Sequence, residues 1–177
     1  MSNFANGTKE TEATLLAGLD KFGGPDAVGN YAYGWAWAMS APNPYVKQYA
    51  SHVGGVRNGM VIAWPGHTPA GGIRSQFSHV TDIVPTLLEV VGIQAPSSVN
   101  GVAQQPIDGI SLAYSFKDAK APERHDTQYF EMMGNRGIYH QGWWAGTTPK
   151  REPWGDKAPA GGDPTDYKWE LYDLRKD

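Results

Sequence analysis

The stretch TDIVPTLLEVVG, residues 81–92, is the clearest helix in the sequence. Thr81 suits the cap position, Asp82 suits the positive end of the helix, and Pro85 falls in the first turn, where amide protons have no helical partner. The apolar side chains recur on one stripe, made of Ile83, Val84, Leu87, Leu88 and Val91. Because Gly92 provides a stop, the pattern predicts an amphipathic helix over 81–91.

A buried strand is predicted shortly before this helix. The run GMVIAWPG, residues 59–66, is continuously apolar and bounded by turn signals, which is typical of a strand covered on both faces of a parallel or mixed sheet. Strand, loop and helix in this order indicate an α/β domain. Earlier in the chain, residues 10–22 predict a helix with Leu15, Leu16, Leu19 and Phe22 on one face. Residues 30–45 keep no period and predict an ordered loop.

The last third of the chain predicts a small antiparallel sheet. Three strand candidates, 127–132, 136–140 and 143–146, are separated by the hairpin-type pairs Gly-Asn and Gln-Gly, and YKWELYDL (167–174) supplies a fourth. A Gly-rich loop leads to a short helix near 110–116, and the charged segment 117–126 is the best internal boundary. The sequence therefore predicts an α/β part over 1–118 and an antiparallel-sheet subdomain over 119–177.

Composition excludes several classes of protein. The 177 residues are 40% hydrophobic and 19% charged with a net charge of −3, so a packed core is expected. The basic residues are scattered, which argues against binding to nucleic acid or an anionic membrane surface. No apolar run reaches the length of a transmembrane helix, and residues 1–7 lack the pattern of a signal peptide. The compartment stays undetermined.

Five segments together resemble the arylsulfatases of the formylglycine-dependent sulfatase family, within the alkaline-phosphatase-like superfamily. They occur in the family's order and spacing, and they are WPGH (64–67), HVTDIVPTLLEVVGI (79–93), NGVAQQPIDGISL (100–112), TQYFEMMGNRGIYHQGWWAG (127–146) and YKWELYDLRKD (167–177). The resemblance runs from about Leu19 to Asp177. It implies the later part of a large α/β catalytic domain, followed by a C-terminal domain with a four-stranded antiparallel sheet and a helix.

The same resemblance implies a formylglycine nucleophile and a calcium ion in the full-length enzyme. Formylglycine is made from Cys or Ser in a Cys/Ser-x-Pro-x-Arg motif, and the metal is held by Asp and Asn side chains. The chain has no cysteine and no Ser-x-Pro-x-Arg motif, and it has no counterpart of the family's metal ligands. We therefore expect this chain to supply neither cofactor.

Two residues of the segment KQYASHVGG, residues 47–55, are the catalytic candidates. A lysine shortly before Glu-Gly-Gly contacts the sulfate group in sulfatases, and Lys47 stands in that place. Such a cation stabilises charge that grows on the ester oxygens in the transition state. His52 could donate to the sulfate or to the leaving group. The segment departs from the family pattern, since Val53 replaces the glutamate and the gap is one residue longer. A solvated surface lysine and a structural histidine remain the alternatives.

Other side chains have simpler explanations. The glycines 54 and 55 predict a tight turn with positive φ, Arg57 could pair with a carboxylate outside this chain, and Asp82 is expected to cap rather than catalyse. The aromatic side chains of residues 35, 37 and 45 suit an aryl pocket or a core equally. Glu131 and Arg136 predict a cross-strand ion pair. Three histidines lack metal-ligand spacing: His67, His125 and His140.

Three functions stay open from the sequence. The first is a portion of an arylsulfatase that acts on a small-molecule sulfate ester. The second is a non-catalytic remnant that serves as an interaction module, and the third is a phosphoester or phosphonate hydrolase of the same superfamily. If the strand predicted in 59–66 lacks neighbours, its open edge is expected to promote self-association.

Overall fold

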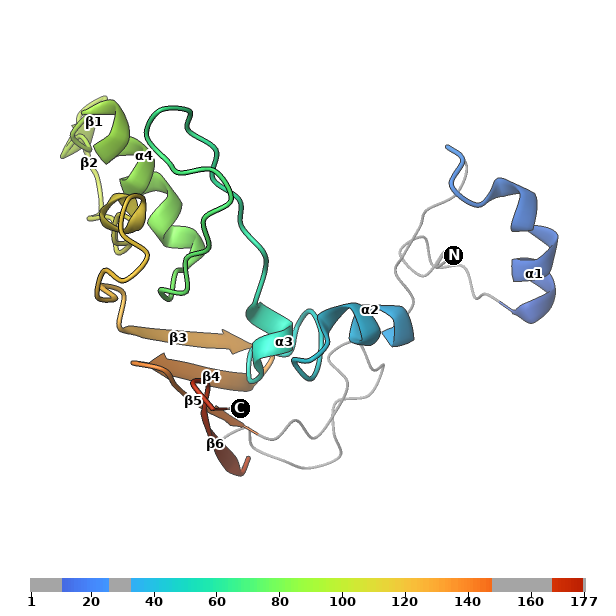
Figure 1. Cartoon of the computed structure of the whole chain (residues 1–177). Helices are drawn as coiled ribbons and strands as arrows, with labels where there is room; N and C mark the ends of the chain where they lie inside the picture. The colour runs from blue at the N-terminus through green and yellow to red at the C-terminus, as the bar shows by residue number, and fades with distance from the viewer. Residues whose placement is uncertain (1–10, 26–32, 148–166, 177) are drawn as a thin grey trace.

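A computed structural model of the chain describes residues 11–25, 33–147 and 167–176 (Figure 1). Its elements in chain order are α1 (Glu12–Ala17), η2 (Leu19–Lys21), α2 (Tyr33–Ser40), α3 (Val53–Val56), η3 (Val80–Asp82), α4 (Ile83–Val91), β1 (Ser98–Val99), β2 (Val102–Ala103), η4 (Ala113–Ser115), β3 (Thr127–Met132), β4 (Asn135–His140), β5 (Trp143–Thr147) and β6 (Trp169–Asp173). The described residues thus mix helices with a four-stranded sheet and a two-stranded hairpin. None of their helices has the length and apolar character needed to span a membrane.

The predicted C-terminal sheet is confirmed. Its strands are antiparallel in the order β3-β4-β5-β6. The two tight turns pass through Met133 (φ 53°) and Gly134 (φ 82°), then Gln141 (φ 46°) and Gly142 (φ 84°). Positive φ at both central positions matches the right-handed twist of the flanking strands. The first turn lies one residue earlier than predicted, because Asn135 already pairs with β3.

The predicted helix at 81–91 is confirmed as α4, which follows the short 3₁₀-helix η3. The cap is different from the prediction: the His79 side chain accepts from the Thr81 amide, and the Asp82 carboxylate accepts from the His79 amide at 2.8 Å. The reciprocal pattern satisfies two amides that the helix leaves without partners. Gly92 ends α4 in the left-handed conformation with φ 71°, as the stop signal predicted.

The buried face of α4 is small and polar, and its apolar stripe is largely exposed. The hydroxyl of Thr86 donates to the Asp82 carbonyl at 2.6 Å and accepts the amide of Leu112 at 2.8 Å. These bonds join α4 to the segment that leads to η4. The exposed apolar side chains of η3 and α4 are Val80, Ile83, Val84, Leu87 and Val91. An amphipathic helix therefore formed as predicted, but the described residues do not cover its apolar stripe.

The predicted strand in 59–66 is wrong for this structure. Residues 57–64 form no strand, and Val61 is 94% exposed. A strand requires a neighbour for its amides and carbonyls, and within the described ranges no ladder reaches this segment. The apolar side chains of residues 59–64 favour burial, but the described part of the chain does not cover them.

Several other boundaries differ from the predictions. Residues 33–40 form helix α2 instead of a loop, because a helix that is apolar all round shows no period in its sequence. The first predicted helix is broken at Gly18 into α1 and η2, and the short helix near 110–116 is the 3₁₀-turn η4. The hairpin of β1 and β2, which turns at Asn100 and Gly101, was not anticipated.

The core lies where residues 46–52 pack on the C-terminal sheet. The buried apolar side chains there include Val46, Tyr49, Ala50, Tyr139 and Trp144. Gly137 and Gly146 in β4 and β5 make room for the contact, since an added Cβ would come within 2.5 Å of the Ala50 carbonyl oxygen and 2.0 Å of the Ser51 carbonyl oxygen, respectively. The indole nitrogen of Trp144 donates to that same Ser51 oxygen at 2.8 Å. Residues 46–52 are thus largely buried, in contact with the sheet (Figure 1).

Candidate functional site

Residues 43–57 fold into consecutive turns that end in helix α3. Backbone bonds from Tyr49 to Val46, from His52 to Tyr49 and from Gly55 to His52 close three turns in a row. The glycines do not adopt positive φ, and the prediction of such a turn was wrong. They are required instead by contact, because a Cβ on Gly54 would lie 2.2 Å from the Pro44 carbonyl oxygen.

Lys47 is exposed on this otherwise buried segment. Its neighbours Tyr45 (φ 67°) and Gln48 (φ 78°) both occupy the left-handed region, which side chains other than glycine rarely adopt. Such conformations cost on the order of 1–3 kcal/mol each and persist only where the surroundings impose them. In the described part of the chain, no hydrogen bond or ion pair restrains the Lys47 ammonium group. The segment therefore combines a strained, buried backbone with an accessible cation.

His52, the second candidate, is only 3% exposed and has partners on both ring nitrogens. Ser51 Oγ lies 3.0 Å from Nδ1, and Glu170 Oε2 of strand β6 lies 3.4 Å from Nε2. These partners favour the ring form in which Nε2 carries the proton and Nδ1 accepts from the Ser51 hydroxyl. Burial lowers the pKa of His52, while the hydrogen bond and charge of Glu170 oppose that shift. Neither Ser51 nor Glu170 was identified from the sequence.

The Ser51, His52 and Glu170 side chains have the chemical types of a hydrolase triad, but not its geometry of access. Ser51 is fully buried, with 0% exposure, and its carbonyl accepts from the Trp144 indole. A nucleophile must reach a substrate carbon, sulfur or phosphorus atom, and Ser51 is enclosed. The three side chains are therefore a structural cluster in this arrangement.

Aromatic rings cover the outer side of this cluster. The Tyr45 ring centroid is 4.2 Å from that of His52, and the Trp37 ring is 5.1 Å from Tyr45. Burial and the nearby charges of Glu170 and Tyr33 raise the pKa of Tyr45. Trp35, by contrast, is 70% exposed. Of the three aromatic residues that suited an aryl pocket or a core, Tyr45 contacts His52, Trp37 contacts Tyr45, and Trp35 is largely exposed.

A buried acid–base pair joins the segment that precedes α4 to the segment that precedes the sheet. The Asp82 carboxylate has 0% exposure and contacts His125 Nδ1 at 2.8 and 2.9 Å. It also accepts the amides of His79 and Ile110, each at 2.8 Å. His125 Nε2 faces the Gln128 amide oxygen at 3.0 Å, so both ring nitrogens face oxygen acceptors. The capping role predicted for Asp82 is confirmed, and the pair with His125 was missed because the two residues are 43 positions apart.

This pair crosses the domain boundary predicted at 118/119, which stays a prediction. We expect Asp82→Ala to lower the free energy of unfolding by about 3 kcal/mol, because it leaves a buried imidazole and two partly buried amides without their acceptor. Urea unfolding followed by tryptophan fluorescence measures the change. The matched control is Asp126→Ala, which removes an exposed carboxylate beside the pair and should leave the unfolding midpoint nearly unchanged. Equal stability of the two variants would contradict the structural role of Asp82.

Three other side chains that the sequence analysis singled out are Arg57, Glu131 and Arg136. Arg57 is exposed. Glu131 and Arg136 face each other across β3 and β4 as predicted, but they make separate contacts: Glu131 accepts the Gly134 amide, and Arg136 lies 5.3 Å from the Trp169 ring centroid.

The described residues do not fit a calcium site. No group of three His, Cys, Asp or Glu side chains among them could hold a metal ion. Asp82, whose carboxylate is fully buried, has both oxygens occupied by His125 and by backbone amides. The chain also contains no cysteine and no Ser-x-Pro-x-Arg from which a formylglycine could be made. No step of a reaction is therefore assigned to a metal or to a formylglycine of these residues.

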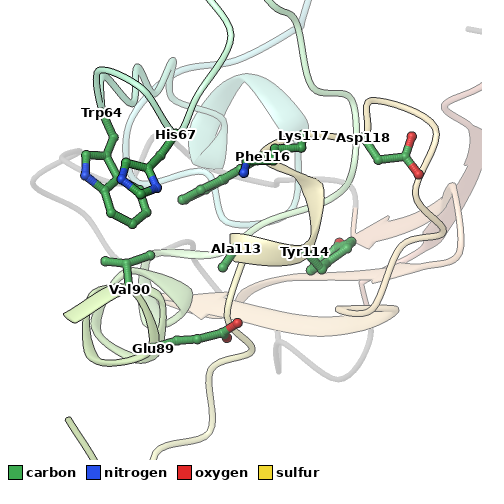
Figure 2. A pocket seen from close by; sticks show the side chains of 9 residues that line it. All are labelled: Trp64, His67, Glu89, Val90, Ala113, Tyr114, Phe116, Lys117 and Asp118. Atoms are coloured by element: carbon green, nitrogen blue, oxygen red, sulfur yellow. The ribbon is translucent and has the colours of Figure 1, made fainter. Parts of the chain in front are cut away.

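An open hollow of about 500 Å³ lies elsewhere, between the turn at 64–67, α4 and η4 (Figure 2). Trp64 and His67 stack on one side of it, with ring centroids 3.7 Å apart and planes at 10°. Its other lining residues are Glu89, Val90, Ala113, Tyr114, Phe116, Lys117 and Asp118. Neither Lys47 nor His52 lines this hollow.

Comparison with known proteins identifies sulfatases. The chain is 30% identical over 102 residues to N-acetylgalactosamine-6-sulfatase of Sus scrofa, covering 56% of this chain and 18% of that protein. It is 30% identical over 105 residues to an arylsulfatase of Klebsiella aerogenes, covering 58% and 22%. An uncharacterized sulfatase of Schizosaccharomyces pombe is 31% identical over 159 residues, covering 85% and 26%.

No family model matches the chain. The chain spans only about a fifth to a quarter of the length of these relatives, since the covered shares are 18%, 22% and 26%. The resemblance drawn from the sequence is nevertheless confirmed by relatives of one kind. The chain is similar to part of the sulfatases.

Proposed function

We propose that these residues form the later part of a sulfatase, in which Lys47 contacts the sulfate group of a small-molecule sulfate ester. The complete enzyme would cleave the S–O bond of the ester and release an alcohol or a phenol together with sulfate. The observation that carries the proposal is the match to a sulfatase over 85% of this chain. A match of that share includes residue 47 wherever it begins.

The geometry around Lys47 supports this role. Its ammonium group is accessible while the backbone on both sides is held in the left-handed region. Fixed donors and cations stabilise developing charge best when they do not need to reorganise during the reaction. A lysine on a rigid, buried segment meets that requirement better than a lysine on a mobile surface loop.

The role proposed for His52 is positioning rather than contact with the sulfate. Its ring is buried between Tyr45 and the Ser51–Glu170 pair, and an enclosed imidazole cannot reach a substrate in this arrangement. Its effect on the reaction would pass through the backbone that carries Lys47.

The proposal places the nucleophile and the calcium ligands on polypeptide outside these 177 residues. We also propose that helix α4 and the segments around it belong to an alkaline-phosphatase-like domain, whose central sheet lies on that other polypeptide. The genomic sequence upstream of Met1 tests this directly. We expect an in-frame stretch that encodes Cys/Ser-x-Pro-x-Arg.

A stop codon in frame immediately upstream, with no such motif encoded, would contradict the proposal and favour a non-catalytic module. Assays of the longer protein with paired aryl sulfate and aryl phosphate substrates then separate the two hydrolase classes. Preference for the phosphate ester would replace the sulfatase assignment by a phosphoester hydrolase.

A further inference from the structure

Strand β6 reaches across the core to the segment that carries Lys47. Glu170, in the middle of β6, places Oε2 at 3.4 Å from His52 Nε2. The Tyr172 hydroxyl, two residues along the same strand, donates to the same carboxylate oxygen. Because residues two apart in a strand point to the same face, Tyr172 can orient the Glu170 carboxylate toward His52.

His52 in turn links two of the turns that build the Lys47 segment. Its amide donates to the Tyr49 carbonyl at 3.1 Å, and its carbonyl accepts the Gly55 amide at 2.9 Å. The preceding residue, Ser51, binds Nδ1 of the ring through its hydroxyl and binds the Trp144 indole through its carbonyl. A fixed His52 ring therefore restrains both the turn that follows Lys47 and the start of α3.

We propose that Glu170 is a positioning residue, which holds the His52 ring and through it the segment that presents Lys47. The proposal rests on the proposed sulfatase function for its consequence in catalysis, whereas the Glu170–His52 contact exists without it. Under this proposal, strand β6 contributes a residue to the candidate site. The proposal also explains why the buried His52 has a partly exposed partner, since the Glu170 side chain is 38% exposed.

The titration of His52 offers a readout of this contact. The charged and titratable groups that face its ring are Glu170 and Tyr172 from β6 and Tyr45 from the preceding loop. Burial lowers the pKa of His52, and Glu170 acts in the opposite direction. Removing the Glu170 charge should lower the pKa of His52 further. Since the folded chain then binds its proton less readily than the unfolded chain, His52 costs stability as the pH falls below about 6.5.

Exchange of the imidazole C2 proton, followed by mass spectrometry, measures this titration at low protein concentration. Trypsin cleavage after Lys47 and Arg57 yields the peptide 48–57, whose only histidine is His52. Cleavage after Arg124 and Arg136 yields 125–136, which contains only the buried His125. We expect Glu170→Gln to lower the pKa of His52, seen as a shift of the midpoint of its exchange profile to lower pH, while the exchange of His125 stays slow.

The controls separate a lost contact from a lost fold. Glu89→Gln removes an exposed carboxylate on α4 and should leave His52 unchanged. If Glu170→Gln unfolds the chain, exchange at His125 becomes fast, and Tyr172→Phe replaces it as the milder variant with the same expected direction. An unchanged titration of His52 in a folded Glu170→Gln or Tyr172→Phe variant overturns the proposal.

Activity of the longer protein that contains these residues tests the catalytic consequence. Glu170→Gln should lower kcat/KM for an aryl sulfate by about tenfold, because the Lys47 segment is less well placed. Loss of activity in Lys47→Ala but not in Glu170→Gln would overturn the positioning role and leave the sulfatase function standing. Full activity in both variants would overturn the roles of Lys47 and Glu170 in catalysis and leave the sulfatase function standing. No turnover of an aryl sulfate by the unsubstituted longer protein would overturn the function itself, while the exchange result would still report on the contact.

Discussion

Replacing Lys47 by alanine is expected to lower kcat/KM for an aryl sulfate by about 10²–10³-fold, in the longer protein that contains this segment. Cleavage of the S–O bond spreads negative charge over the ester oxygens, and an ammonium group close to them stabilises that charge more in the transition state than in the bound substrate. The loss should therefore appear mainly in kcat. Steady-state kinetics over a range of substrate concentrations separates kcat from KM.

Two variants sharpen the measurement. Lys120→Ala removes another exposed lysine, on the connection before the sheet, and should change kcat/KM by less than about threefold. Lys47→Arg keeps the charge but changes its shape, and we expect partial activity. If Lys47→Ala behaves like Lys120→Ala, then Lys47 does not touch the sulfate and the role carried over from the sulfatases fails for this chain.

The parts of the fold that the sequence predicts are those with local signals. The two tight hairpins follow from glycine-containing turns between short apolar strands, and α4 follows from its apolar period and its stop at Gly92. Each of these signals lies within about a dozen residues. Such patterns reflect backbone preferences that the rest of the chain does not need to supply.

The failures share one cause, which is dependence on distant partners. The pattern of residues 59–66 expresses apolar character, but a strand also needs neighbours, and the described residues provide none. Helix α2 is apolar all round and so shows no period. The Asp82–His125 pair brings together residues 43 positions apart, which no local spacing reveals.

Only part of the candidate site was predicted from the sequence. Lys47 and His52 came from a resemblance to sulfatases, whose relatives now confirm the similarity. Ser51 and Glu170 had no such signal, although the alternation of WELYD in β6 puts Glu170 and Tyr172 on one face. That alternation could have indicated a polar pair facing the core, but not its partner.

The exposed apolar surface of the chain predicts how it behaves by itself. Val61 is 94% exposed, Ile73 84% and Leu87 56%. Contiguous apolar surface that meets water is a site of association in soluble proteins, and a segment without ladder partners can pair with another chain. The matched regions cover only 18%, 22% and 26% of the relatives, so in them more polypeptide is present than these residues provide.

The isolated 177 residues are therefore expected to self-associate or to be poorly soluble, and to show no turnover of an aryl sulfate with or without calcium. Light scattering after size-exclusion chromatography measures the mass against 19.3 kDa for one chain. Val61→Lys should shift the population toward the monomer, because the charge is costly to bury against a second chain. The control Val102→Lys changes a 64% exposed valine in the β1–β2 hairpin and should have little effect. A stable monomer would contradict the exposed-surface argument, and calcium-dependent turnover would contradict the placement of the nucleophile and the metal ligands outside these residues.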